Sequence, residues 1–385
     1  MTPGDGRETV ITGKFATQEM VLNMGPHHPS THGVLRFILQ TDGEMIVHVT
    51  PDIGFLHRGL EKIAELVPYQ SFMPFTDRID YLASLNCNLG YAVTVEKLAG
   101  IEVPEKAEYL RVIGAELTRM ASHFIGFGAL LLDLGAVTPF VHALRERERY
   151  NDLMEKLCGA RLTHNYVRIG GVSHDIPSGF KEETMHFIDH LEYEFIKEFN
   201  DLASFNSILI NRLKNVGVIS REQAVEYTLT GPNLRGSGVN YDTRKDDTYS
   251  IYDRFDFDIP VGKGMFGTVG DCYDRYWARI EEITQSCRII RQALHQIPDK
   301  GEIRTKLPKA FKVPEGEAYV RTECPRGQLG FYLISDGGKS PARLKIKTGS
   351  FSAMTIIELI SHGVMVADLV AIIGSLDVIA PEIDR

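Results

Sequence analysis

The sequence lacks the closely spaced cysteines that hold most iron–sulfur clusters and structural zinc ions. Its five cysteines are scattered, and no two of them form a CxxC pair. Because such centres draw their thiolates from short, repeated spacings, the usual cluster and zinc motifs are excluded. An odd number of scattered cysteines is typical of reduced thiols in a cytosolic protein. If the chain takes part in redox chemistry, the metal centre is expected to belong to another protein.

Long uninterrupted apolar runs are also missing. The best candidate for a membrane span, residues 124–141, carries Asp133 near its centre and Pro139 close to its end. A charge at that depth is costly in a bilayer, so the segment predicts a buried helix. The first twenty residues contain acidic side chains and no apolar core, which argues against a secretory signal or transit peptide. Any membrane attachment is therefore expected to come through partner proteins.

Positive charge is scarce, since the formal net charge is −9. This balance argues against nucleic acid as the principal partner, because phosphate binding depends on concentrated Lys and Arg. Nucleotide motifs are incomplete as well. The segment "GKGMFG" (262–267) fits GxGxxG but follows an acidic stretch and no buried strand, and "DGGKS" (336–340) has Leu333 where a P-loop needs glycine. Both segments are predicted to be turns.

The apolar periodicity predicts one mainly α domain with small β elements towards both ends of the sequence, an α+β fold. An Asp-Gly pair between two alternating runs predicts a β-hairpin over residues 34–50. Residues 318–347 alternate like strands around glycine-rich turns, residues 229–263 read as mostly irregular, and two short helices with an extended tail are expected at the end. Helical periodicity is found over residues 58–67, 76–100, 105–134, 139–159, 180–206 and 271–296.

Histidines are concentrated in the segment "GPHHPSTHG" (25–33), which leads into the predicted hairpin. His28 and His32 could share a zinc ion, but no third ligand is evident nearby. The residues alone leave a metal role and a proton role equally open. A second histidine pair, His186 and His190, has helical spacing but lacks the Glu of HExxH, which favours a solvated helix face.

Asp133 and Tyr91 are the polar residues that stand out within apolar helices. A carboxylate in the setting "GALLLDLGAVTPF" needs a cation or a hydrogen-bonding partner, and a histidine is a natural one. A structural acid is the alternative. Tyr91, in "NLGYAVTVEKL", is typical of a core tyrosine whose hydroxyl is satisfied.

Several ordered motifs together resemble the family of the D-type subunit of respiratory complex I, the NADH:quinone oxidoreductase. The resemblance runs from about residue 24 to residue 385, nearly the whole chain. It is carried by the segments "NMGPHHPSTHGVLRF", "GFLHRGLEKIAE", "RIDYLASLNCNLGYAVTVEKL", "LLDLGAVTPF", "HNYVRIGGV", "LTGPNLRGSGVNYDTRK", "RGQLGFYLISDGG" and "SLDVIAPEIDR".

The resemblance implies a fold similar to the large subunit of [NiFe] hydrogenases. It divides the chain into an N-terminal extension (1–23) and one domain (24–385), made of a hairpin region with the quinone-site loop (24–57), a helical core (58–300) and a C-terminal part (301–385) with β elements, helices and a tail. The positions of the four hydrogenase cysteines are held by Asp80, Ala83, Ile379 and Glu382. Because all four soft ligands are missing, no nickel centre is expected and the cavity is free for another occupant.

In that family the occupant is a quinone headgroup. The resemblance implies that His32 and Tyr91 hydrogen-bond the two quinone oxygens and that Asp133 pairs with His32. A [4Fe-4S] cluster in the adjacent subunit would supply electrons only, so these three residues become the expected proton donors. Arg58 and His123 match positions near that cluster, where a cation and a titrating imidazole would tune its potential.

The function implied is that of a peripheral-arm subunit of proton-translocating NADH:quinone oxidoreductase on the cytoplasmic side of a bacterial inner membrane. The chain is expected to hold no metal or redox cofactor of its own. Expected partners are the cluster-bearing B-type subunit, the C-type subunit and the membrane H-type subunit, with ubiquinone or menaquinone as the quinone. Two alternatives stay open: the equivalent subunit of a ferredoxin- or hydrogenase-related membrane complex, and a non-catalytic scaffold.

Overall fold

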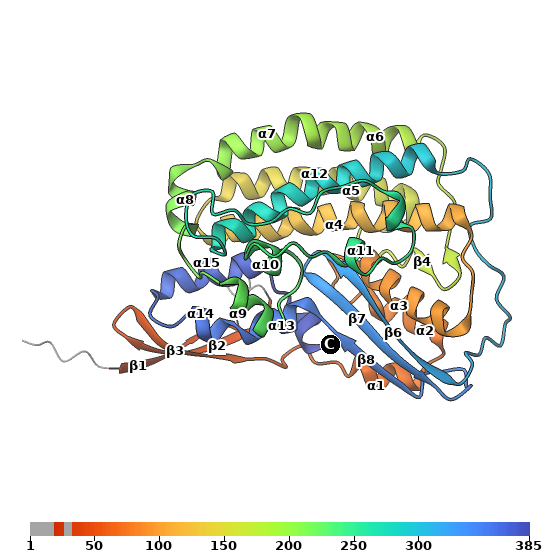
Figure 1. Ribbon diagram of the computed structural model, residues 1–385, viewed down its shortest axis with the longest axis horizontal. Coiled ribbons are helices and arrows are strands. Elements are labelled where there is room, and N and C mark those ends of the chain that lie inside the picture. Colours follow the sequence, from red (N-terminus) through yellow and green to blue (C-terminus); the bar gives the residue numbers. More distant parts are fainter. Residues whose placement is uncertain (1–18, 27–32) are drawn as a thin grey trace, which may run out of the picture.

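The fold is organised around one long central helix. A computed structural model describes residues 19–26 and 33–385. In it, α4 (Glu105–Asp133) is buried over most of its length and packs against four other helices. Figure 1 shows the long helices lying side by side, which confirms the mainly α fold with small antiparallel sheets. The helices packed on α4 are α3 (Ser84–Ala99), α5 (Val137–Cys158), α12 (Cys272–Gln296) and α15 (Val366–Leu376).

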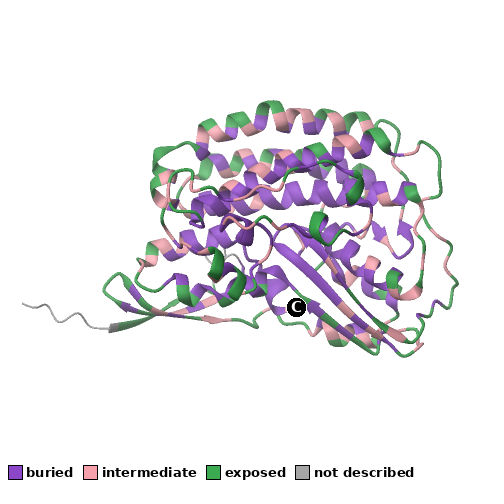
Figure 2. Ribbon diagram, in the orientation of Figure 1, coloured by how far each residue is buried: buried purple, intermediate pink, exposed green. Residues whose placement is uncertain are grey.

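The ends of these helices follow local sequence signals. The side chain of Asp271 caps α12 by accepting the backbone N–H of Asp274 at 2.9 Å. The helix α5 ends at Gly159, whose φ of 75° is a left-handed conformation that glycine adopts without strain. Figure 2 shows buried residues concentrated in α4 and exposed ones on the outer helices, the pattern that apolar periodicity predicts.

The helix expected over residues 180–206 is helical nearly throughout, but it is not a regular α-helix. It runs from α6 (Phe180–His190) through two π-helical segments, η1 (Leu191–Phe195) and η2 (Asn200–Ser204), with α7 (Ile196–Phe199) between them. A π turn inserts one extra residue into the helical repeat, and apolar spacing alone does not reveal it.

A three-stranded antiparallel sheet contains the predicted hairpin. Strands β2 (Arg36–Asp42) and β3 (Met45–Asp52) pair so that Asp42 faces Met45 across the turn at Gly43, which confirms the hairpin. A further strand, β1 (Glu19–Met24), pairs with the other edge of β2 and was not predicted. The six residues of β1 contain no glycine or proline that would mark a strand boundary. Figure 1 shows the sheet extending away from the helices.

The second three-stranded sheet packs on α3 and forms the other side of the core. It consists of β6 (Gly316–Cys324), β7 (Gly327–Ser335) and β8 (Arg343–Lys347), which confirms the strands expected over residues 318–347. Two short helices, α1 (Leu60–Leu66) and α2 (Tyr69–Thr76), lie beside this sheet and α3.

The end of the chain differs from the prediction. The expected extended tail is wrong, because residues after Asp377 form a buried helix, α16 (Ala380–Asp384), which Pro381 helps to start. The region 229–263 also contains more structure than expected. The remaining short elements are β4 (Val167–Arg168), β5 (Gly171–Val172), α8 (Ser207–Leu213), α9 (Arg221–Glu226), α10 (Gly231–Gly236), α11 (Thr243–Asp246), η3 (Tyr252–Arg254), α13 (Gly349–Thr355) and α14 (Ile357–Ile360).

None of the helices in residues 19–26 and 33–385 combines the length and apolar character needed to cross a bilayer. The division into residues 1–23 and 24–385 stays a prediction.

Candidate functional site

A small cavity forms beside α4 and α5, where three further parts of the chain meet. Its volume is about 160 Å³, and most of its lining is apolar. The loop before α3 contributes Tyr81, the turn between β6 and β7 contributes Arg326, and the segment before α16 contributes Asp377. The other lining residues are Leu82, Ile125, Gly126, Ala129, Leu132, Phe140, Val378 and Ile379. An apolar cavity with a few convergent polar groups is the usual form of a small-molecule site.

A buried arginine joins the segments that form this cavity. Nη1 of Arg326 lies 2.6 Å from Oδ2 of Asp80 and donates to the Ser122 hydroxyl at 2.9 Å. Its Nη2 donates to Oδ1 of Asp377 at 3.2 Å. Because Arg326 is only 2% exposed, its charge depends on these partners for compensation. The two carboxylates raise the pKa of Arg326 despite its burial, so it stays a cation.

A third buried acid, Glu382 in α16, lies close behind this ion cluster. It is 1% exposed, and its carboxylate accepts a hydrogen bond from the Ser350 hydroxyl of α13. Burial raises the pKa of Glu382 to about 7, and the neighbouring Asp80 adds like-charge repulsion. Burial also raises the pKa of Asp80, although Arg326 opposes that effect. The segments that hold Asp80, Ala83, Ile379 and Glu382 therefore do come together.

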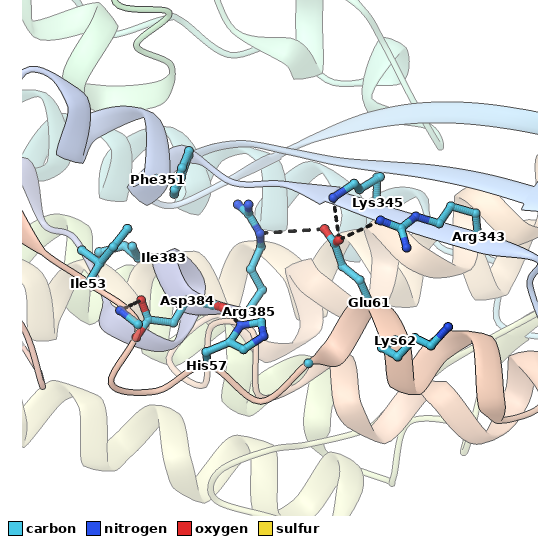
Figure 3. Close-up of a pocket in the computed structure, with 12 residues that line it drawn as sticks. Ile53, His57, Glu61, Lys62, Arg343, Lys345, Phe351, Ile383, Asp384 and Arg385 are labelled. Carbon is cyan, nitrogen blue, oxygen red and sulfur yellow. Dashed lines mark hydrogen bonds and ion pairs between the residues drawn. The ribbon is translucent and has the colours of Figure 1, made fainter.

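Ion pairs and hydrogen bonds at the surface fix α16 in place. The Asp384 carboxylate accepts the backbone N–H groups of Gly54 and Leu56 at 2.8 and 2.7 Å. Figure 3 shows Glu61 of α1 pointing towards Arg343, Lys345 and Arg385. Because α16 is short, these contacts, rather than its own helical bonds, hold Glu382 at the cluster.

Tyr91 does not line this cavity. It is fully buried between Phe72 and Phe331, with ring centroids 5.1 and 5.7 Å away, and its hydroxyl donates to the Tyr69 carbonyl at 3.3 Å. Burial raises its pKa well above the usual value. These are the features of a core tyrosine, the alternative that its apolar setting had indicated.

Tyr81 was missed by the sequence reasoning, although it follows Asp80 directly. It lines the cavity and is half-buried. Burial raises its pKa, and the Arg326 guanidinium partly offsets that effect. The expected hydrogenase ligand position at Asp80 pointed to this stretch of the chain, but it did not single out Tyr81.

Of the predicted pair His32 and Asp133, the structure describes Asp133. His32 lies outside the described residues, whereas Gly33 packs against Ala380 of α16, to within 3.0 Å of where a side chain would begin. Asp133 is the last residue of α4, so it lies in a helix as expected, but it is half-buried rather than fully buried. Its neighbour Leu132 lines the cavity.

Arg58 and His123 occupy very different environments. Arg58 is exposed and donates from Nη2 to the Pro381 carbonyl at 3.2 Å, so it touches α16. Burial lowers its pKa, and Asp384 opposes that shift. His123 is fully buried in α4, with Nε2 2.7 Å from Oε2 of Glu282 in α12. Burial lowers the pKa of His123, and the Glu282 carboxylate opposes that shift.

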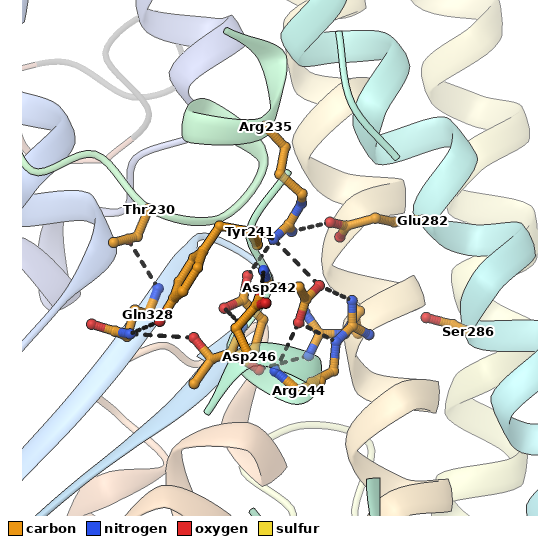
Figure 4. A network of polar contacts seen from close by, with 12 residues as sticks. Thr230, Arg235, Tyr241, Asp242, Arg244, Asp246, Glu282, Ser286 and Gln328 are labelled. Atoms are coloured by element: carbon orange, nitrogen blue, oxygen red, sulfur yellow. Dashed lines mark hydrogen bonds and ion pairs between the residues drawn. The ribbon is translucent and has the colours of Figure 1, made fainter. Parts of the chain in front are cut away.

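Through Glu282, His123 joins an extended buried ion network. Figure 4 shows the part of this network around Arg235, Arg244 and Glu282. Arg235 is paired with Glu282 and lies 2.8 Å from Oε1 of Glu323. Arg244 lies 2.6 Å from Oδ2 of Asp242 and 3.1 Å from Oε2 of Glu116. The network links α4, α10, α11, α12 and β6, and its members are between 0% and 1% exposed. Its guanidinium groups balance buried carboxylates that could not otherwise remain charged.

A metal centre was not expected, and the described part of the chain holds no group of three or more His, Cys, Asp or Glu side chains arranged around a metal position.

Comparisons with known proteins agree with the resemblance. The chain matches the family described as "Respiratory-chain NADH dehydrogenase, 49 Kd subunit" over residues 133–310 and 305–385. It is 55% identical to the D 2 subunit of NADH-quinone oxidoreductase from Anaeromyxobacter dehalogenans, across 96% of this chain and 97% of that protein. A protein of the same name from Sorangium cellulosum is also 55% identical, over 97% and 96% of the two chains. The NADH-quinone oxidoreductase D subunit of Bacillus anthracis is 50% identical over 96% and 99%.

The three relatives match over nearly the full length of both chains. The family model covers residues 133–385. The chain therefore belongs to the family of the respiratory-chain NADH dehydrogenase 49 kDa subunit, the D-type subunit of the NADH-quinone oxidoreductase known as complex I.

Proposed function

We propose that the cavity between Tyr81, Arg326 and Asp377 receives the quinone headgroup in the assembled oxidoreductase. The observation that carries the proposal is the meeting of two segments, around Asp80 and around Ile379, at one apolar cavity with a few polar groups. An aromatic ring with two carbonyl oxygens suits such a lining, because the apolar walls hold the ring and donors fix its oxygens.

The roles of individual residues follow from this placement. Tyr81 is the tyrosine whose position supports hydrogen bonding to one quinone oxygen, and Tyr91 stays an untested prediction. His32 remains the proposed partner of the other oxygen, supported by the contact of Gly33 with Ala380, which directly follows the cavity-lining Ile379. Asp133 remains the proposed partner of His32, supported by its neighbour Leu132, which lines the cavity. Reduction takes two electrons and two protons, and these side chains supply protons.

The partner protein that carries the [4Fe-4S] cluster is proposed to dock beside Arg58 and α16. Arg58 is exposed, and its guanidinium touches α16, which directly follows the cavity-lining residues 377–379, so a cation lies at the surface beside that segment. His123, held by Glu282, is proposed to make the cluster potential depend on pH. The proposal also includes contacts with the C-type and H-type subunits and coupling of quinone reduction to proton translocation. It places the chain on the cytoplasmic face of the membrane.

Two tyrosine variants test the quinone site. In assembled membranes, Tyr81→Phe is expected to lower the rate of quinone reduction by NADH about 10- to 100-fold, because it removes a proton donor at the cavity. Tyr91→Phe tests the role predicted for Tyr91. Because its hydroxyl donates a long hydrogen bond to the Tyr69 carbonyl, the rate is expected to stay within about twofold of the wild type, and a loss as large as that of Tyr81→Phe would restore the predicted role.

His32→Ala is measured in the same assay and should act like Tyr81→Phe. Normal rates in both variants would refute the quinone site and leave the scaffold alternative in place. Electron input is checked separately with an artificial acceptor that takes electrons from NADH before the quinone site, and this activity should not change.

A further inference from the structure

The acids behind the cavity outnumber the cations that compensate them. Asp80, Asp377 and Glu382 are each at most 2% exposed. The guanidinium groups that reach them belong to Arg326, which contacts Asp80 and Asp377, and to Arg279, whose Nε lies 3.6 Å from Oδ2 of Asp377. Among the residues that the structure describes, three carboxyl groups thus share two cations within a buried space. Because an uncompensated buried charge is costly, one of the three acids holds a proton at rest.

Glu382 is the acid that the contacts select. Asp80 and Asp377 both receive hydrogen bonds from Arg326, at 2.6 and 3.2 Å, whereas Glu382 receives its hydrogen bond from the neutral Ser350 hydroxyl. The groups that face Glu382 from the surrounding elements are the acids Asp80 and Asp377, the cation Arg326, and the Cys87 thiol of α3. Burial raises the pKa of Glu382 to about 7, and two anions against one cation add to the preference for the neutral form.

We propose that Glu382 stores one exchangeable proton and releases it towards the cavity through the Asp80–Arg326–Asp377 cluster when the quinone is reduced. This inference rests on the proposed quinone site. Two electrons, which NADH provides in the reaction of this family, and two protons convert the quinone to the quinol. The donors at the headgroup give both protons. Glu382 reprotonates one of these donors and becomes a carboxylate, and water later returns a proton to Glu382 and to the other donor. Glu382 does not touch the quinone, so it acts as a positioning residue.

The sign of the pH dependence follows from the neutral resting form. Glu382 is protonated below about pH 7 and loses its proton as the pH rises through that value. Quinone reduction in the wild type is therefore expected to fall above about pH 7, approaching 10-fold per pH unit if the stored proton limits the rate.

The central test is Glu382→Gln in the assembled complex. Glutamine copies the neutral resting form, so the fold and assembly should be retained. The decline of quinone reduction above about pH 7 should disappear, and the rate at lower pH should drop to the level that the wild type shows at high pH. In infrared difference spectra, the wild type should lose the C=O band of a protonated carboxyl group as the pH rises through about 7. The variant should show no such change. An unchanged pH profile or an unchanged band would overturn the inference.

A second variant should shift the pH dependence of quinone reduction while Glu382 itself stays in place. Ser350→Ala deletes the hydroxyl that donates to the Glu382 carboxylate, so it should raise the pKa of Glu382 and shift the decline about one pH unit towards higher pH. A shift to lower pH, or none, would contradict the assignment to Glu382. Glu358→Gln, at a side chain that is 61% exposed, is the control and should leave the profile in place.

The outcomes separate this inference from the proposed quinone site. If Tyr81→Phe and His32→Ala leave quinone reduction unchanged while Glu382→Gln abolishes the infrared band, the quinone site fails and the release of the proton towards it fails as well, although Glu382 is shown to hold a proton at rest. If the first two variants lose activity but Glu382→Gln keeps the wild-type profile and band, the proton store fails and the quinone site stands.

Discussion

Replacing Arg235 with methionine is expected to destabilise the fold by about 3–5 kcal/mol, because it removes one partner of a buried ion network. Arg235 is 0% exposed, pairs with Glu282 and lies 2.8 Å from Oε1 of Glu323. Methionine fills much of the space of the arginine side chain but carries no charge. Glu282 and Glu323 therefore lose a positive partner. The pKa of Glu323, which burial already raises, should rise further. The purified complex should show a lower thermal transition for this chain, or its assembly should fail.

The control for Arg235→Met is the same substitution at a surface pair on α12. Arg288 lies 2.8 Å from Oδ2 of Asp258, and the two side chains are 48% and 77% exposed. Exposed pairs contribute about 0–1 kcal/mol, so Arg288→Met should scarcely change the thermal transition. Equal effects of the two substitutions would show that burial of the network does not determine its contribution.

The main elements of the fold could be predicted because their signals are local. Apolar residues recur on the helices around α4, and Asp42-Gly43 marks the hairpin turn. The helix α16 could not be predicted in this way. Its few residues are helical because Asp384 binds the backbone at Gly54 and Leu56, more than 300 positions away. Such contacts leave no trace in the spacing of neighbouring residues.

The site was harder to predict than the fold, because its polar groups come from separate segments. Arg326 looks like an ordinary turn residue between two strands, and only the packed structure places it between Asp80 and Asp377. Tyr81 and Tyr91 lie in one stretch of sequence, and nothing local distinguishes them. The structure does, because one lines the cavity and the other is enclosed by Phe72 and Phe331.

Gly126→Ala is expected to lower quinone reduction about 100-fold without disturbing assembly, since small misplacements at a reacting site cost about that much. Gly126 lies in α4 at the cavity, and a Cβ atom there would be 2.8 Å from both carboxylate oxygens of Asp377. Asp377 must then move, which disturbs its 3.2 Å contact with Arg326. The helix itself should gain about 1 kcal/mol, because alanine is the better helix former.

The same substitution at Gly114, also in α4, separates the two effects. A Cβ atom there would meet only the end of the Leu85 side chain, at 2.9 Å, and that flexible group can turn aside. Gly114→Ala should therefore keep wild-type quinone reduction, while both variants keep electron transfer from NADH to an artificial acceptor. Wild-type quinone reduction in Gly126→Ala would contradict the placement of the headgroup, because the altered wall would then have no effect on the reaction.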